Sequence, residues 1–119
     1  MHFDTQMRRV SDSLRRLGIL RTYRGYQAVM DSVRLVLEDE ARLNLVTKGV
    51  YMAAAGCGRR WGAVERNIRT VVRRAWETNP AYLEELAGYP MDGPPTASEF
   101  IDILATDAMR NAGETEAKL

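Results

Sequence analysis

Four arginines and one glutamate lie close together in the stretch "GAVERNIRTVVRRAW", residues 62–76. An arginine can donate two parallel hydrogen bonds to guanine O6 and N7, and a glutamate can accept one from the cytosine amine. In a helix of 3.6 residues per turn, one side of this stretch carries most of these charges together with Thr70. The residues of this side are Glu65, Arg66, Arg69, Thr70 and Arg73. This excess of positive charge on one side is suited to a polyanion.

The opposite side of the same stretch is aliphatic, with the spacing of a helix that buries one face: Val64, Ile68, Val71, Val72 and Ala75. Arg74 falls on neither side, and we expect it to be exposed or at a backbone contact. In the simplest alternative the arginine side is an ordinary solvated surface. Glu65 could then pair with Arg69 one turn away, but the surface would keep its excess of positive charge.

The segment "KGVYMAAA", the glycine-containing "GCGRR" and the arginine-bearing helix follow one another in the layout of a helix-turn-helix. In that motif the second helix enters the major groove by its N-terminal turns. Ala54, Gly58 and Val64 supply the small residue, the turn glycine and the aliphatic that such a pair needs. The layout alone fits an ordinary helical hairpin equally well. Together with the charges, it predicts a recognition helix over about residues 61–76.

The spacing divides the candidate DNA-binding residues into two groups. Arg66 and Glu65 could read adjacent G and C positions, while Arg69 and Arg73 could reach phosphates or a further base. Backbone or additional contacts are expected from residues near the helix starts and along the helix: Lys48, Arg59, Arg60, Trp61 and Arg73. For Trp61, packing at the hairpin is the simpler interpretation. Trp76 and Tyr26 are interpreted as aromatics of the core or its edge.

The charge of the chain is segregated along its length. Residues 1–76 hold 15 Lys and Arg against 7 Asp and Glu, a balance of +8, whereas residues 77–119 hold 2 against 9, a balance of −7. The single cysteine, Cys57, excludes an internal disulfide and fits a reducing compartment. No apolar run approaches the roughly 20 residues of a membrane span, and no signal peptide is evident. We therefore expect a cytoplasmic protein.

No combination of residues in the sequence indicates catalysis. There is no phosphate-binding glycine loop, no Ser/His/Asp set and no spacing of metal ligands, and His2 and Cys57 have no partner residues nearby. We expect no enzyme activity, no cofactor and no metal.

Nearly every other segment has helical periodicity, as over residues 4–17 and 26–37. Asn79 with Pro80 predicts a helix start and Gly88 its end, and Thr96 with Glu99 forms a capping box. The fold class is therefore all-α, a compact bundle of about six helices. We expect residues 1–110 to form a single helical DNA-binding domain and residues 111–119 to form a flexible tail.

Several segments also resemble one known family, in order, from about residue 10 to residue 110. "VERNIRTVVRRAW" is similar to the recognition helix of the C-terminal effector domain of the sporulation master response regulator (the Spo-zero-A type). "LGI", "RGYQAVMDSV", Thr47-Lys48, "LAGYP" and "PPTASEFI" resemble the family's segments at the corresponding places.

The resemblance implies an all-α effector domain that binds short DNA boxes, often in tandem, and regulates transcription. By matched position, Glu65 and Arg66 stand where the family contacts bases, and Arg69 where it makes its next DNA contact. The chain has no room for the family's receiver domain, so no phosphorelay input is expected within it. The first helix and the turn of the helix-turn-helix are about one residue shorter than in the family, and Met52 stands where the family has a proline.

A third departure from the family's pattern bears on partners other than DNA. Ala87 replaces a phenylalanine of a segment linked to the sigma subunit of RNA polymerase, so DNA binding is better supported than contact with sigma. The alternative function is a helical protein-interaction module that binds or titrates another regulator through its acidic C-terminal half. The segregated charge would also permit tandem or homodimeric self-association on DNA.

Overall fold

The computed structural model describes residues 2–38 and 61–117. This part of the chain is all-helical and contains no strand: α1 is His2–Arg16, α2 is Tyr26–Glu38, α4 is Trp61–Thr78, α5 is Pro80–Ala87 and α6 is Ala97–Ala117. The predicted all-α class is confirmed. The first helix of the expected helix-turn-helix, with Ala54, and its turn, with Cys57 and Gly58, lie outside the described residues. None of the described helices is long and apolar enough to cross a membrane.

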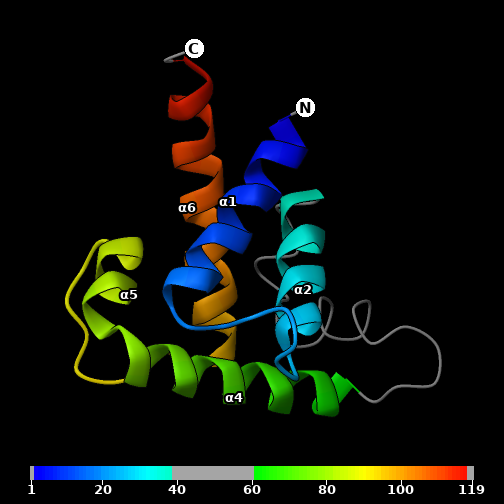
Figure 1. The fold of residues 1–119 in the computed structure, drawn as a ribbon, viewed down its shortest axis with the longest axis vertical. Coiled ribbons are helices and arrows are strands. Elements are labelled where there is room, and N and C mark those ends of the chain that lie inside the picture. Colours follow the sequence, from blue (N-terminus) through cyan, green and yellow to red (C-terminus); the bar gives the residue numbers. More distant parts are fainter. Residues whose placement is uncertain (1, 39–60, 118–119) are drawn as a thin grey trace.

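Three of the helices form an upright group, and one further helix lies across an end of this group. Helices α1, α2 and α6 run roughly along the long axis of the molecule, α4 crosses one end of them, and α5 packs beside the group (Figure 1). The two chain ends lie at the opposite end from α4. One face of α4 is consequently covered by the group, and the other is turned away from it.

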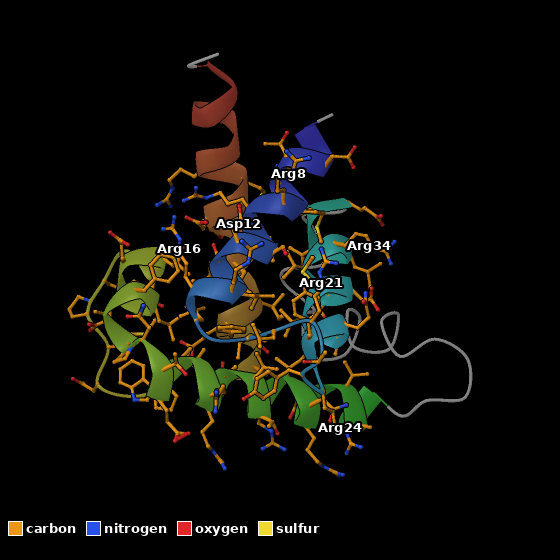
Figure 2. The ribbon with its side chains drawn as sticks, viewed as in Figure 1. Arg8, Asp12, Arg16, Arg21, Arg24 and Arg34 are labelled. Atoms are coloured by element: carbon orange, nitrogen blue, oxygen red, sulfur yellow. The ribbon has the colours of Figure 1, made fainter. Side chains whose placement is uncertain are left out.

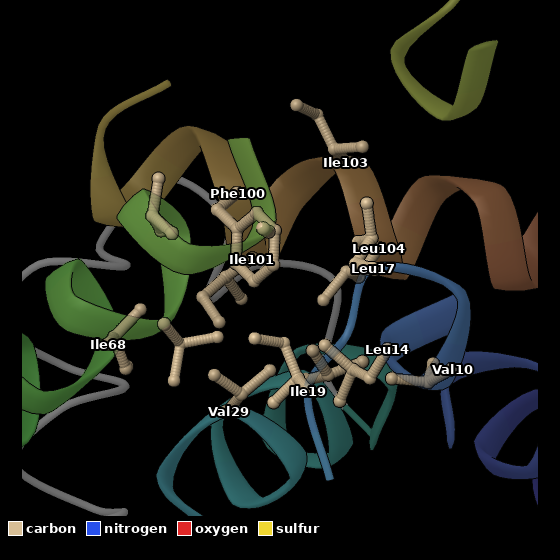
Figure 3. Close-up of a cluster of buried hydrophobic side chains, with 14 of the residues drawn as sticks. Val10, Leu14, Leu17, Ile19, Val29, Ile68, Phe100, Ile101, Ile103 and Leu104 are labelled. Carbon is tan, nitrogen blue, oxygen red and sulfur yellow. The ribbon is translucent and has the colours of Figure 1, made fainter. Parts of the chain in front are cut away.

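The core forms where α6 passes between the other helices. The residues of α6 that are at most 1% exposed are Phe100, Ile101, Leu104, Ala105 and Ala108, and they meet aliphatic side chains from α1, α2 and α4 (Figure 3). Helix α1 contributes Val10 and Leu14 of the predicted face, and Leu17, directly after the helix, is buried with them. Full burial of such a side chain stabilises the fold by about 1.5–3 kcal/mol, so this cluster fixes the relative positions of the helices.

The predicted helix ends are confirmed by their hydrogen bonds. The Asn79 side chain accepts from the Tyr82 N–H at 3.2 Å, and Pro80 is the first residue of α5. Gly88, at φ +85°, donates its N–H to the carbonyl of Glu84 at the other end of that helix. Thr96 and Glu99 bond each other's backbone N–H at 3.1 and 2.9 Å, which is a capping box at the start of α6.

Helix α6 continues to Ala117 and so enters the segment 111–119. The flexibility expected of that segment stays a prediction.

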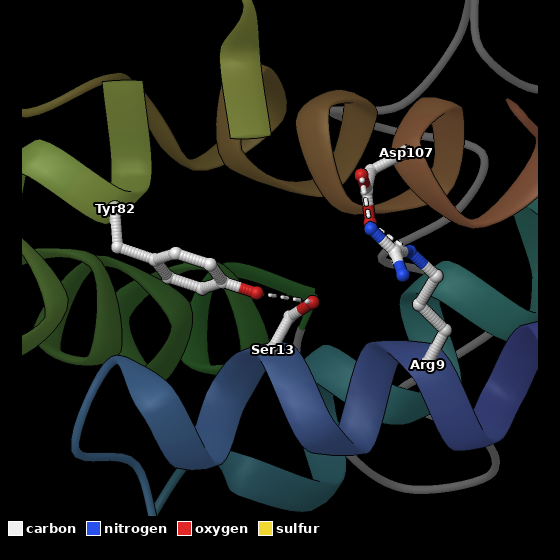
Figure 4. Close-up of polar contacts among 4 residues, drawn as sticks. All are labelled: Arg9, Ser13, Tyr82 and Asp107. Carbon is white, nitrogen blue, oxygen red and sulfur yellow. Dashed lines mark hydrogen bonds and ion pairs between the residues drawn. The ribbon is translucent and has the colours of Figure 1, made fainter. Parts of the chain in front are cut away.

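Polar contacts attach α1 to α5 and α6 (Figure 4). Arg9 donates from Nε and Nη2 to the two carboxylate oxygens of Asp107, at 2.8 and 3.2 Å. The Asp107 side chain is only 6% exposed, whereas that of Arg9 is 35% exposed. Tyr82 donates a weaker hydrogen bond to Ser13, at 3.3 Å. The Arg9–Asp107 pair thus joins residues 98 positions apart in the sequence.

The buried carboxylate makes this ion pair a sensitive point of the fold. Arg9→Ala removes two charge-assisted hydrogen bonds from the buried Asp107 carboxylate, so we expect the free energy of unfolding to fall by about 2–3 kcal/mol, reduced from the fully buried case because Arg9 is partly exposed. The control is Arg15→Ala, which breaks the exposed pair with Asp12 at 3.2 Å and should cost less than about 1 kcal/mol. Urea unfolding of the three proteins measures both, and equal losses would contradict the expectation.

Candidate nucleic-acid interface

Helix α4 has one fully buried side, as the sequence predicts. Val64, Ile68, Val71, Val72 and Ala75 are all buried in the core. The two tryptophans also belong to α4: Trp61 is its first residue, and Trp76 packs partly buried against the core. Tyr26 of α2 is buried, so both predictions of core or core-edge aromatics are confirmed. With its aliphatic side held in this way, α4 is fixed in rotation and its other side faces outward.

Arg66 lies at the centre of the outward side and is exposed. No carboxylate pairs with it among the residues that the structure describes. Its main-chain carbonyl accepts a hydrogen bond from the Thr70 hydroxyl at 3.2 Å, but its guanidinium makes no such bond within the described residues. Within the described part of the chain, no other group therefore occupies the donors of this side chain.

Glu65 and Arg69 form the pair that the sequence allows. Arg69 Nε lies 3.7 Å from Glu65 Oε1, and the side chains are 63% and 25% exposed respectively. A pair of this length and exposure is worth at most about 0.5 kcal/mol. It can therefore open at little cost when a stronger partner for either group approaches.

A surface pocket of about 490 Å³ opens on this side of α4, between the helix and the start of α6. Glu65, Arg69 and Arg73 line it from α4, and the segment Pro94–Ser98 lines it from α6 and the preceding loop. These three charged residues therefore turn toward α6, while Arg66 stays on the outermost part of the helix. The sequence places all four residues on one side, but it does not show this division.

On its other flank, α4 is contacted by the α1–α2 loop, residues 17–25. A Cβ on Gly25 would lie 2.7 Å from the Asn67 carbonyl oxygen and 2.8 Å from Val71 Cγ2, and one on Gly18 would lie 2.8 Å from Thr78 Cγ2. Both glycines also have positive φ, +97° and +81°. Only glycine fits at these two points without strain.

The aromatic ring of Tyr23 provides a third contact between this loop and α4. The Arg74 guanidinium lies over the ring, 5.1 Å from its centroid, which is a cation–π contact worth about 0.5–1 kcal/mol at an exposed site. Arg74 is exposed, as expected, but its partner could not be predicted. The four contacted positions of α4 are Asn67, Val71, Arg74 and Thr78, which form a single row along the helix.

The remaining predicted contacts are not located by the structure. Lys48, Arg59 and Arg60 lie outside the described residues, and of Trp61 only the backbone is described. Among the described residues, no group of three His, Cys, Asp or Glu side chains could hold a metal ion.

An all-α bundle with an arginine-bearing helix exposed across one end has the form of a DNA-binding regulatory domain. The family model described as "Sporulation initiation factor Spo0A C terminal" matches residues 10–108. The chain belongs to this family, which consists of DNA-binding effector domains and not of enzymes.

The close approach of Gly25 to α4 gives a direct test of the loop. Gly25→Ala should lower the free energy of unfolding by about 1–3 kcal/mol, because the new Cβ meets Asn67 backbone and φ is positive. Gly93→Ala is the matched control, since nothing lies within 4 Å of its Cβ position, and it should change stability by less than about 0.5 kcal/mol. Urea midpoints compare the two, and a neutral Gly25→Ala would show that the loop is not held against α4.

Proposed function

We propose that this domain binds duplex DNA sequence-specifically by placing the outward side of α4 in the major groove. Arg66 and Glu65 contact bases, Arg69 makes a further base contact, and Arg73 contacts the backbone or an additional base. The observation that carries the proposal is the position of Arg66. It is exposed on a helix whose opposite side is buried, and its donors have no carboxylate partner in the described part of the chain.

The dimensions and the charge of the helix support this placement. An α-helix with its side chains is about 10–12 Å across, and the major groove is about 12 Å wide. The outward side of α4 also carries Arg69 and Arg73, whose positive charges attract the negatively charged phosphates. Glu65 is held near Arg69 by a weak ion pair. Breaking that pair, so that Glu65 can accept from a cytosine amine and Arg69 can make another DNA contact, costs little free energy.

Base readout by Arg66 predicts a specific loss. On a duplex selected from a random library by the wild-type domain, Arg66→Ala should weaken binding by about 1–3 kcal/mol and relax the preference at one base pair. Arg34→Ala is the control, because Arg34 is an exposed arginine on the outer side of α2, away from α4 (Figure 2), and pairs with Asp31 at 3.6 Å. Titration of labelled duplexes measures both variants. Unchanged selectivity in Arg66→Ala would remove its base-reading role.

The alternative is a protein-interaction module that uses the acidic C-terminal half. Five carboxylates of that half are exposed: Glu77, Glu85, Asp92, Glu99 and Asp102. The two functions differ in their affinity for a nonspecific polyanion. A DNA-binding domain should be retained on heparin at low salt and eluted as salt rises. A module that acts only through its acidic surface should flow through the same column.

Two further partners follow from the family and the charge distribution. The acidic surface of one copy could meet the basic N-terminal part of the next, which favours tandem or homodimeric association on adjacent boxes. Contact with the sigma subunit would use the end of α5, where Ala87 is partly buried and Tyr89 is 49% exposed. Both are proposals that depend on DNA binding by α4.

A further inference from the structure

The α1–α2 loop brings one more arginine to the flank of α4. Arg24 lies between Tyr23, whose ring is stacked under Arg74, and Gly25, which touches the backbone of Asn67. Consecutive Cα atoms are about 3.8 Å apart. The backbone of Arg24 is consequently fixed within one residue of two contacts with α4.

The side chain of Arg24 is directed toward the outward side of the molecule. It is exposed, and Figure 2 shows it at the same edge as α4, beside the first half of that helix. Asn67, the contact point of its neighbour Gly25, directly follows Arg66 in the sequence. Arg24 therefore extends the arginine-bearing surface sideways, from the helix onto the loop.

Charge around Arg24 favours an anionic ligand. Among the described residues no carboxylate pairs with it, and the acidic residue in the first half of α4, Glu65, lines the pocket on the opposite flank. Arg74 lies on the flank of α4 that the loop contacts, and Arg66 is exposed on the outermost part of the same helix. Together with Arg24 they give this part of the surface an excess of positive charge, which favours a polyanion.

We propose that Arg24 contacts a DNA phosphate beside the groove that α4 occupies, so that the α1–α2 loop is a second DNA-binding element outside the helix pair. This inference rests on the proposed function of α4. A helix about 10–12 Å across fills a groove about 12 Å wide. A side chain on the flank of the helix then meets the sugar–phosphate backbone, not the base edges.

The loop is suited to this role because it is already ordered. Its two glycines and Tyr23 contact α4 at separate points, so the position of Arg24 relative to Arg66 is set before DNA arrives. Little backbone entropy remains to be lost on binding. A phosphate contact from such a point fixes the depth and the rotation of α4 in the groove, and it carries no sequence information itself.

The experiment compares Arg24→Ala with Arg21→Ala, each on the selected duplex and on a random duplex, over a series of salt concentrations. Arg21 is the matched control, since it is exposed in the same loop but lines a groove between α1 and α2 with Arg8 and Gln27. Arg24→Ala should bind both duplexes about three- to tenfold more weakly at low salt, and its salt slope should be smaller by about 1. Arg21→Ala should match the wild-type protein within about twofold.

Two further measurements separate the role of the charge from a structural effect. Arg24→Lys keeps a phosphate-binding cation and should recover most of the affinity and of the salt slope. The urea midpoint of Arg24→Ala should equal that of the wild-type protein, because the side chain is exposed. Weak binding with normal stability and rescue by lysine would support the proposal.

Other outcomes would overturn it, and they are distinguishable from failure of the proposed function. If Arg24→Ala binds as the wild-type domain does while Arg66→Ala is weakened, the loop contact is wrong and the role of α4 stands. If Arg24→Ala changes the preferred base, the contact is to a base and the phosphate assignment is wrong. If the wild-type domain binds no duplex, both proposals fall together.

Discussion

Helix α6 contacts each of the other four described helices, and its buried residues fill the space between them. Phe100, Ile101 and Leu104 are almost completely buried, and they lie at the centre of the core among aliphatic side chains of the surrounding helices. Helix α6 is not apolar all round, since Glu99 and Asp102 on its other side are exposed. Helix α4 likewise buries one side in this core, so its arginines lie on the sides turned away from it.

The rotation of α4 about its own axis follows from the same packing. Its aliphatic side is held by the core, while the α1–α2 loop occupies one flank and the start of α6 borders the other. A helix held on three sides cannot turn without breaking several contacts. Its fourth side, with Arg66, is thereby fixed in direction, which is what precise contact with base edges requires.

Local regularities in the sequence predicted the elements and much of the surface. The spacing of Val64, Ile68 and Val71 identified the buried side of α4, and the caps at Asn79 and Thr96 identified the starts of α5 and α6. These signals act within a few residues, so they can be read from one chain. They also placed Arg66 and its neighbours on the correct side of the helix. The proposed DNA contacts themselves stay predictions.

Contacts between distant segments could not be read in this way. Nothing in the neighbourhood of Arg9 identifies Asp107 as its partner, and Tyr23 has no spacing relation to Arg74. Gly18 directly follows the segment 4–17 whose periodicity predicts a helix, but its close approach to Thr78 depends on how the loop crosses α4. The division of the arginine side between Arg66 and the pocket beside α6 is also tertiary. The position of Arg24 beside α4 belongs to this second group.

The chain contains two tryptophans, Trp61 and Trp76, and both are residues of α4. Light absorbed by tryptophan alone is therefore emitted from this one helix, and the rest of the molecule is silent at that wavelength. The domain thus carries its own optical label on the element to which the DNA-binding role is assigned. Its emission follows the surroundings of α4 without any dye or added residue.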